Sequence, residues 1–390
     1  MMPRPFLGSL FSLCLTALHP VSAAPASEFR PDEIWPDDKV VHINAHGGGV
    51  LFHEGTYYWF GEHKIEGGAG NVAHVGVGVY SSKDLYNWKN EGIALKVSDD
   101  PASKLVKGCV IERPKVLFNA KTKKFVMWFH HELIGQNYDA SLSGVAVADT
   151  VTGPYTYLGS FRPNAGVWPT NAPEEIRKPL TPEEDHRLAN AGLRGDYVPD
   201  WGRDMVLRRD FQGGQMARDM SLFLDDDGKA YHIYSSESNS TLHISLLTDD
   251  FLKPAGKFIR IFPLAFNEAP AMFKHKGKYF LFSSGCTGWA PNAARLASAD
   301  RISGPWTEHG NPCLGTDEQK KFTFHSQSTF VLPVQGKKDA FIFMADRWNP
   351  GNAIDGRYIW LPVQFNNDGL PFLEWKDKWS LEFFDKQPAP

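Results

Sequence analysis

The chain has 390 residues, with 41 Lys and Arg against 45 Asp and Glu, so its formal net charge is only −4. This balance, without any basic run or stripe, argues against a nucleic-acid partner. The length suits one large β domain or two ordinary ones, and the 12 Trp, 12 Tyr and 27 Phe provide for a large core or for faces that stack on sugar rings.

The first 23 residues have the form of a secretory signal peptide. Arg4 supplies a positive charge, residues 6–17 form an apolar run, and Val21-Ser22-Ala23 provides a small-residue cleavage site. No later segment is apolar enough to span a bilayer, so no membrane partner is expected. We therefore predict a mature domain at 24–390 that is exported to the periplasm or the medium.

Removal of this leader leaves three cysteines, which allow at most one internal disulfide. Cys286 and Cys313 are the pair to test first, and whether they form a bond stays open; Cys109 is the third cysteine. The chain contains neither a Cys-x-x-Cys nor a His-Glu-x-x-His motif. A zinc site therefore has no support in the sequence, and no metal ligands are predicted.

Five repeats of one pattern organise the rest of the chain. In each repeat an apolar run, a short polar turn and an aromatic-rich run predict a β-hairpin; the turns and second runs lie at 54–60, 123–129, 227–234, 276–282 and 337–344. A further strand pattern follows each hairpin, at 75–80, 143–148, 241–245, 294–298 and 357–362. Five such units predict an all-β chain that folds as a single five-bladed β-propeller.

The spacing of the repeats is uneven only between the second and the third. The stretch at about 162–217 is rich in Pro, Asn, Gly and charged residues, and it predicts an insertion. A short helix is expected within it at 181–188. A division into two domains is the alternative, but no linker-like change in composition supports it.

Polar residues stand at the beginning of each repeat, where the inner strands of a propeller approach one another. Among them Glu268 lies between apolar runs, where partial desolvation would raise its pKa and suit it to donate a proton near neutral pH. An ordinary solvated strand residue is the alternative for each position taken singly. Several carboxylates at the same phase favour a functional site, because burying them together is costly.

Several motifs give the chain a specific resemblance to a known family. They are Ile-Asn-Ala-His-Gly-Gly-Gly at 43–49, Tyr-Tyr-Trp-Phe-Gly-Glu at 57–62, Ile-Glu-Arg-Pro-Lys-Val at 111–116, the run at 219–228, Glu-Ala-Pro at 268–270, Thr-Gly-Trp-Ala-Pro-Asn at 287–292 and Asp-Arg-Trp at 346–348. With them the chain resembles glycoside hydrolase family 43, in the branch that contains exo-β-1,3-galactanases. The resemblance extends from about Trp35 to Trp379.

The resemblance implies an inverting glycosidase with Glu268 as general acid and Asp219 as the carboxylate that orients it. Most of the family has a general-base Asp in the first blade, where this chain has His46-Gly47. In the galactanase branch a Glu and a Gln line the cleavage site instead, and these match Glu112 and Gln327. We expect Gln327 to position the attacking water, with its imidic tautomer as one route, and Glu112 to supply negative charge.

The predicted substrate is β-1,3-galactan or an arabinogalactan side chain. The residues expected to bind the sugar are Glu62, His46, Arg113, Asn239 and Trp289; for Trp289, core packing is an equal alternative. No cofactor is expected to be required, and a central calcium ion, with His325 near the axis, is kept as an alternative.

Three other functions remain open at this point. An α-L-arabinofuranosidase or a β-xylosidase of the same family would differ in the sugar that is released. A carbohydrate-binding propeller without catalysis would explain the missing base, although Glu268 and Asp219 argue against it. A sialidase would need three arginines for its substrate carboxylate, and the chain offers no clear set.

Overall fold

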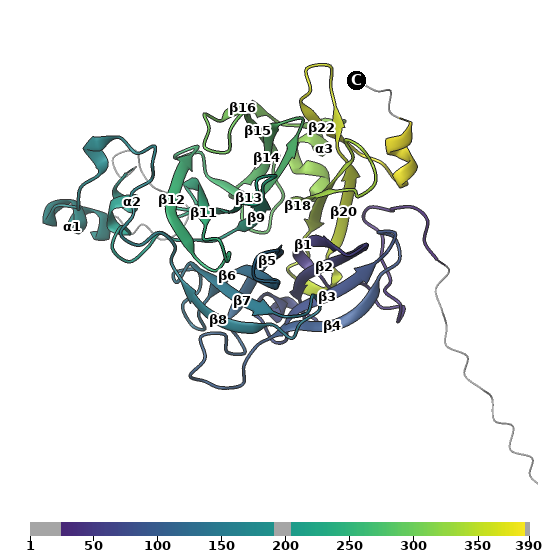
Figure 1. Cartoon of the computed structure of the whole chain (residues 1–390), viewed down its shortest axis with the longest axis horizontal. Coiled ribbons are helices and arrows are strands. Elements are labelled where there is room, and N and C mark those ends of the chain that lie inside the picture. The colour runs from purple at the N-terminus through teal and green to yellow at the C-terminus, as the bar shows by residue number, and fades with distance from the viewer. Residues whose placement is uncertain (1–24, 191–203, 387–390) are drawn as a thin grey trace, which may run out of the picture.

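The computed structural model describes residues 25–190 and 204–386, and β-strands dominate both ranges (Figure 1). The first sheet consists of β1 (His46–His53), β2 (Thr56–His63), β3 (Gly76–Ser82) and β4 (Lys89–Lys96). The second consists of β5 (Val110–Asn119), β6 (Lys124–Glu132), β7 (Leu142–Ala148) and β8 (Thr156–Phe161). The third consists of β9 (Met220–Leu224), β10 (Ala230–Ser236), β11 (Thr241–Leu247) and β12 (Pro254–Ile261).

Three further sheets follow along the chain. One consists of β13 (Asn267–His275), β14 (Lys278–Gly285), β15 (Arg295–Ala299) and β16 (Thr307–Gly310). Another contains β18 (Gln327–Pro333), β19 (Phe341–Arg347) and β20 (Arg357–Pro362). The last is small, and its order is β17 (Cys313–Leu314), β22 (Pro371–Glu374) and β21 (Gln364–Phe365).

The sheet count corrects the sequence prediction. The expected hairpins and their third strands are all present, but the β-propeller contains six sheets, so the prediction of a five-bladed propeller is wrong. The additional sheet pairs β17 with β22 in parallel and β22 with β21 antiparallel. Its strands are two to four residues long. Strands of this length are too short to show an alternating pattern that sequence analysis can detect.

The long strands are buried on both faces because each sheet packs between two neighbours. In β2, Tyr57 and Trp59 pack in one cluster with residues of β19 and β20. Tyr58 and Phe60 pack in another cluster, with residues of β6. Successive side chains of a strand point to opposite faces, so an aromatic residue at every position serves both interfaces. This explains why the second run of each predicted hairpin is continuously apolar.

Helices are few among the described residues. The segment between β8 and β9 carries α1 (Pro182–Asn190), which bears out the helix expected at 181–188, and α2 (Met205–Arg209). In Figure 1 the two helices α1 and α2 lie to one side of the sheets, beyond β12. A third helix, α3 (Asp317–Phe322), precedes β18. Short 3-10 turns lie at η1 (Gly68–Asn71), η2 (Glu174–Ile176), η4 (Thr323–His325), η5 (Ala353–Asp355) and η6 (Leu381–Asp385).

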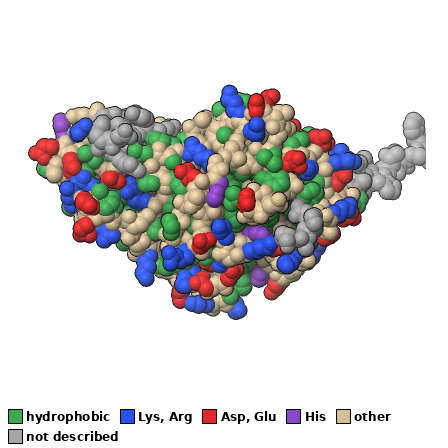
Figure 2. All heavy atoms as spheres, turned by 90° about the horizontal axis from the view of Figure 1, so that it is seen from above, with side chains coloured by type: hydrophobic (Ala, Val, Ile, Leu, Met, Phe, Trp, Pro, Cys, Tyr) green, Lys and Arg blue, Asp and Glu red, His purple; other side chains and the backbone are tan. Residues whose placement is uncertain are grey.

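No helix within 25–190 or 204–386 is long and apolar enough to cross a membrane. The predicted leader at 1–23 lies outside the described residues. Positive and negative side chains are interspersed over the face shown in Figure 2.

Cys286 and Cys313, the first candidate pair for a disulfide, are not joined. Cys313 lies on β17, in the small sheet of β17, β22 and β21, and is buried among apolar side chains. Cys286 follows β14, and its Sγ lies 3.8 Å from the backbone oxygen of Asn239. The two thiols therefore face different surroundings, a separation that the spacing in the sequence does not show.

The inner strands of the long sheets are β1, β5, β9, β13 and β18, and each contacts the next, with β18 returning to β1. Four of them have an irregular register close to their first residues, at His46/Gly49, Glu112/Lys115, Glu268/Ala271 and Ser328/Phe330. A β-bulge bends a strand and changes the direction of the adjacent side chains. These irregularities place the polar starts of the strands around one centre.

Candidate active site

A cavity of about 450 Å³ lies where the inner strands begin. Eight of the nine predicted site residues line it, namely Glu62, Glu112, Arg113, Asp219, Asn239, Glu268, Trp289 and Gln327. They come from strands and loops that are far apart in the sequence. The structure thus brings together Glu112, Asp219, Glu268 and Gln327 from the starts of four repeats, together with four of the residues expected to bind the sugar.

Glu268, the second residue of β13, is held from two directions. The Nδ2 of Asn239 donates a hydrogen bond to Oε1 of Glu268 over 2.8 Å. The backbone amide of Ala269, the next residue, donates to Oδ2 of Asp219 over 3.0 Å. Asp219 therefore fixes the backbone that carries Glu268, and Asn239 fixes the carboxyl group itself.

Arg113 connects several of the polar groups in the cavity. It has a left-handed backbone, with φ of 55°, at the irregular part of β5. Its Nη2 lies 2.8 Å from Oδ2 of Asp219 and donates to Oε1 of Gln327 over 2.5 Å, and its Nη1 donates to the backbone oxygen of Ser328 over 2.9 Å. Because these contacts engage both ends of the guanidinium fork, Arg113 holds protein groups in position rather than standing open to a sugar.

Gln327, the first residue of β18, has both ends of its amide engaged. Its Oε1 accepts from Arg113 and also from Nε1 of Trp348, which lies 3.1 Å away. Its Nε2 donates to Oγ of Ser284 over 2.9 Å. Two N–H donors on the oxygen fix the amide orientation, because the reversed amide would place its own N–H groups against them.

Glu112 is the second carboxylate at the centre, and it is held as an anion. Its Oε1 accepts from the hydroxyl of Tyr138 over 2.6 Å, and its Oε2 lies 2.9 Å from Nδ1 of His130. Burial alone would raise the pKa of Glu112, but the hydrogen bond and positive charge of His130 lower it to about 2. The group therefore stays ionised throughout the neutral range.

His130 carries the positive charge that this arrangement requires. Its Nε2 lies 2.8 Å from Oε1 of the fully buried Glu132. Burial opposes the charge, but the two carboxylates together raise the pKa of His130 to about 10. The imidazolium thus donates from both nitrogens.

Glu62 is buried at the end of β2 and completes the polar wall. Its Oε1 accepts the backbone amide of Arg113 over 2.9 Å, and its Oε2 pairs with Lys64. Burial raises the pKa of Glu62, and the Lys64 ammonium opposes this rise. A Cβ atom on Gly47 would lie 2.1 Å from Oε1 of Glu62, so only glycine leaves room for this carboxylate.

Comparison with known proteins shows where this chain belongs. The sequence model of glycosyl hydrolases family 43 matches residues 200–371. The solved structure of the GH43 β-1,3-galactosidase BT3683 with galactodeoxynojirimycin is 50% identical to this chain, with a TM-score of 0.84, and the match covers 90% of this chain and 100% of that one. The chain belongs to glycoside hydrolase family 43. It is therefore a glycosidase.

Other solved members of family 43 show the same likeness. The exo-β-1,3-galactanase from Phanerochaete chrysosporium, solved with galactose, is 33% identical at a TM-score of 0.70, over 91% of this chain and 68% of that one. The exo-β-1,3-galactanase from Clostridium thermocellum is 33% identical at a TM-score of 0.72, over 90% of this chain and 66% of that one. A comparison with curated protein sequences found no match.

One predicted sugar ligand of this family 43 chain, His46, does not line the cavity. Its ring is buried and stacks on Tyr358 of β20 with a centroid separation of 5.3 Å. Its Nδ1 is 3.8 Å from Oδ2 of Asp346, which accepts the backbone amide of Gly47 over 2.5 Å. The residue in the place of the usual general base therefore packs behind the site, and burial lowers the pKa of His46 well below its ordinary value.

Seven residues that line the cavity were not predicted as site residues. Three of these seven contact a predicted one, namely His130, Tyr138 and Trp348. Tyr138 lies in the loop after β6, where the sequence has no repeat to locate it. His130 and Glu132 are two residues apart on β6, a spacing that places both side chains on one face and is the signal that could have found them. Trp348 was visible within the Asp-Arg-Trp motif.

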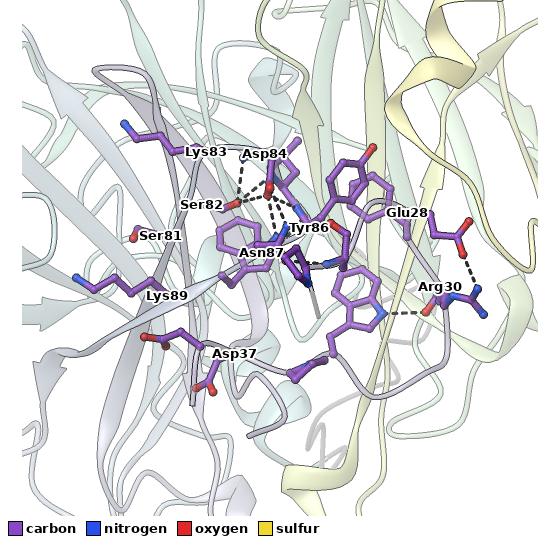
Figure 3. Close-up of a pocket in the computed structure, with 18 of the residues that line it drawn as sticks. Glu28, Arg30, Asp37, Ser81, Ser82, Lys83, Asp84, Tyr86, Asn87 and Lys89 are labelled. Atoms are coloured by element: carbon purple, nitrogen blue, oxygen red, sulfur yellow. Dashed lines mark hydrogen bonds and ion pairs between the residues drawn. The ribbon is translucent and has the colours of Figure 1, made fainter. Parts of the chain in front are cut away.

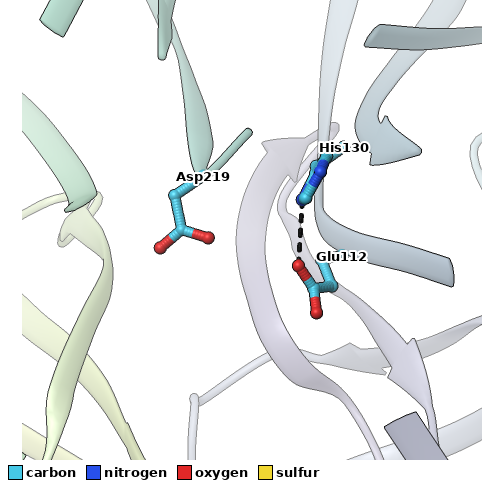
Figure 4. A group of neighbouring side chains, drawn as sticks. All are labelled: Glu112, His130 and Asp219. Atoms are coloured by element: carbon cyan, nitrogen blue, oxygen red, sulfur yellow. Dashed lines mark hydrogen bonds and ion pairs between the residues drawn. The ribbon is translucent and has the colours of Figure 1, made fainter. Parts of the chain in front are cut away.

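A metal ion does not suit the central residues of this glycosidase. Glu112, His130 and Asp219 offer atoms within 4.8 Å of one another, and Figure 4 shows the carboxylate of Asp219 apart from the bonded pair of Glu112 and His130. A histidine must be neutral at the nitrogen that binds a metal, whereas both nitrogens of His130 face carboxylates. Glu112 and Asp219 already accept hydrogen bonds from the protein. The atoms that could bind a metal ion are therefore already engaged in hydrogen bonds with other protein groups.

His325 is also displaced from its predicted place near the axis. It lies on η4, its ring stacks on Phe322, and its Nε2 is 3.2 Å from Oε1 of Glu318. The side chain is 44% exposed and does not line the cavity. The prediction that it helps to hold an ion or water at the centre is therefore wrong.

A larger cavity, of about 800 Å³, lies between residues 25–38 and 81–89 (Figure 3). None of the predicted site residues lines it. Its central polar groups bond mainly to one another: Asp84 accepts from the backbone of Tyr86 and Asn87, and Asn87 exchanges hydrogen bonds with the backbone of Ala26. These contacts stabilise the turn at 84–87 and provide no arrangement of acid and base.

Proposed function

We propose that this chain is an exported, exo-acting β-1,3-galactosidase that cleaves β-1,3-galactan or arabinogalactan side chains with inversion. The observation that carries the proposal is the hydrogen bond from Asn239 to Glu268 inside a cavity that also contains the anion Glu112. The likeness to proteins named as β-1,3-galactosidase and exo-β-1,3-galactanase supports the choice of sugar and linkage. The predicted leader supports export.

Glu268 acts as the general acid in this proposal. The N–H of Asn239 donates to Oε1, and the proton for the departing sugar is assigned to the other oxygen, Oε2. Asp219 holds the following peptide unit and Asn239 holds the carboxyl group, so the backbone and the side chain of Glu268 are both kept in position. Proton transfer to the glycosidic oxygen makes that oxygen a better leaving group.

Glu112 acts by its charge. The bond between C1 and the leaving oxygen breaks through an oxocarbenium-like transition state, whose positive charge an adjacent carboxylate stabilises. A pKa of about 2 makes Glu112 a weak proton acceptor but a permanent anion. The hydrogen bonds from His130 and Tyr138 fix the position of this charge before the substrate arrives.

Gln327 positions the water that attacks C1 from the opposite face. Its oxygen already accepts from Arg113 and Trp348, so a proton on that oxygen, as the imidic tautomer requires, would face two other donors. The contacts favour the ordinary amide, whose second Nε2 hydrogen is available to the water or to a sugar hydroxyl. As the oxygen of this water bonds to C1 and the bond from C1 to the leaving oxygen breaks, the water releases one proton to the surrounding solvent. Orientation is the contribution that this geometry supports.

Trp289 and Trp348 are proposed to form the apolar side of the sugar site. Their rings meet edge to face with a centroid separation of 5.7 Å. Trp289 is 41% exposed, although both rings line the cavity. Exposure on this scale favours a stacking role over core packing, because the C–H face of a sugar would cover the ring.

The decisive experiment is digestion of β-1,3-galactan and of arabinogalactan-protein glycan, with product analysis during the first turnovers. We expect single galactose units from the non-reducing end, with the α-anomer appearing first by NMR. Release of arabinose or xylose from their aryl glycosides, without galactose, would favour the other specificities of the family. Binding of galactan without any release would favour the non-catalytic alternative.

A further inference from the structure

A fully buried ion pair lies behind the loop that carries Asn239. Glu237 has no exposed surface, and the guanidinium of Arg260 on β12 forms a bidentate ion pair with its carboxylate. The Nε and Nη2 atoms of Arg260 donate to Oε1 and Oε2 of Glu237, each over 2.6 Å. The Nε2 of His243, also fully buried, lies 2.7 Å from Oε1 of Glu237.

The same arginine reaches the segment between β8 and β9. Its Nη1 donates to Oδ1 of Asp204, directly before α2, over 2.9 Å. Its backbone also exchanges two hydrogen bonds with Asn171, over 3.0 and 2.7 Å. Arg260 therefore joins the inserted segment to the buried face of the third sheet.

The loop that these contacts hold has an unfavourable backbone. Glu237, Ser238 and Asn239 are consecutive and left-handed, with φ of 52°, 58° and 63°. None of them is glycine, so the conformation persists only where surrounding contacts impose it. The side chain of Glu237 supplies the strongest of these contacts at one end, and at the other end Asn239 donates to Glu268.

We propose that the Glu237–Arg260 ion pair is the device that positions Asn239 against Glu268, and that Asp204 extends this control to the inserted segment. The inference rests on the proposed function, in which Glu268 is the general acid. Glu237, Arg260 and Asp204 are positioning residues, since none of them lines the cavity. They act on the proton donor through the backbone of residues 237–239.

A role in fold stability alone explains the geometry less well. Burying an ion pair costs desolvation that the attraction within the pair often fails to recover, so such pairs are weak devices for stability. Glu237, one member of this pair, lies in a loop two residues before Asn239. The pair therefore affects the geometry of that loop more directly than it affects core packing. A bidentate arginine fixes direction as well as charge.

The test compares two substrates whose need for a general acid differs. β-1,3-Galactobiose has a poor leaving group and depends on Glu268, whereas 4-nitrophenyl β-galactoside has a good one and depends on it less. Arg260→Lys keeps the charge but loses the fork. We expect kcat/KM to fall roughly 30-fold on galactobiose and by less than about 3-fold on the aryl galactoside.

Two further variants complete the comparison. Asn239→Ala should reproduce the same contrast between substrates, because it removes the final contact. Arg208→Lys is the matched control: Arg208 is a buried arginine that forks onto Glu184 within the inserted segment, over 2.9 and 2.6 Å, without a contact to the loop at 237–239. It should leave the ratio of the two rates unchanged.

The outcomes separate the inference from the proposed function. Equal losses on both substrates in Arg260→Lys would mean a merely structural pair and would overturn the inference. A wild-type enzyme that released galactose from neither substrate would overturn the proposed function. A crystal structure of Arg260→Lys gives a readout without turnover: the 2.8 Å contact of Asn239 with Glu268 should lengthen, and its retention would also contradict the inference.

Discussion

The guanidinium of Arg113 lies 2.8 Å from Asp219, and the same Nη2 atom also donates to Gln327. One nitrogen thus fixes the separation between the group that orients the proposed acid and the group proposed to hold the water. In the proposed mechanism these two groups act on opposite sides of the bond that is cleaved, so the position of this nitrogen should affect both steps.

Arg113→Lys should therefore impair catalysis more than binding. A lysine ammonium cannot reach Asp219, Gln327 and Ser328 with the directions of the planar fork. We expect kcat to fall by about 100-fold with a much smaller change in KM, because misplacement of reacting groups costs on this order. Steady-state kinetics on β-1,3-galactobiose provide the measurement, with Arg208→Lys as control. A change confined to KM would instead indicate that Arg113 binds sugar.

Glu268→Gln should remove the proposed proton donor while keeping the shape of the site. Its amide can still face Asn239, so folding should be unaffected. Turnover of β-1,3-galactobiose should fall by about 10³-fold or more, within the range of general acid catalysis. Turnover of an aryl galactoside with a good leaving group should fall much less. Similar losses on both substrates would argue against the acid role.

The sequence located the inner strands because each repeat pairs an apolar run with an aromatic-rich one, and sheets packed on both faces require that pattern. It also located Glu268, Asp219 and Glu112, since they share one phase of the repeat. The short strands β17, β21 and β22 of the small sheet show no such pattern, so the predicted number of sheets was wrong.

The errors at individual residues come from tertiary contacts. His46 stands at the expected place in the first repeat, yet its ring packs on Tyr358, which is 312 residues away along the chain. Tyr138 and Trp348 reach the cavity from outer loops, and no periodicity governs a loop. Cysteine counting left the pairing of Cys286 with Cys313 open, because a count carries no information about distance.

The buried pair of Glu112 and His130 should make stability depend on pH in a definite direction. The pKa of Glu112 is lowered to about 2 from 4.5, so its contribution is present above pH 4.5 and is lost as pH falls toward 2. The pKa of His130 is raised to about 10 from 6.5, so its contribution is full below pH 6.5 and is lost as pH rises toward 10. Both contributions are complete between pH 4.5 and 6.5.

His130→Gln should therefore cost most in that window, by about 3 kcal/mol or more, because it leaves Glu132 buried without its cation. The difference from wild type should shrink above pH 6.5. His309→Gln is a control of opposite sign, since burial lowers the pKa of His309 and its removal should help only at low pH. Urea unfolding across pH 4.5–9 measures both, and a constant difference for His130→Gln would contradict the charged pair.

Gln327→Ala should separate the positioning of water from the supply of the proton. Its loss frees Nη2 of Arg113 and Nε1 of Trp348 from their shared acceptor, and it removes the only proposed anchor for the water. Turnover should fall by about 100-fold on galactobiose and on the aryl galactoside alike, because both reactions need the same attack on C1. This equal loss contrasts with the selective loss expected for Glu268→Gln.

Ser284→Ala is the matched control for Gln327→Ala, since it removes only the acceptor of Nε2 and should lower turnover by less than about 10-fold. Near-normal turnover in Gln327→Ala would exclude the amide from the reaction.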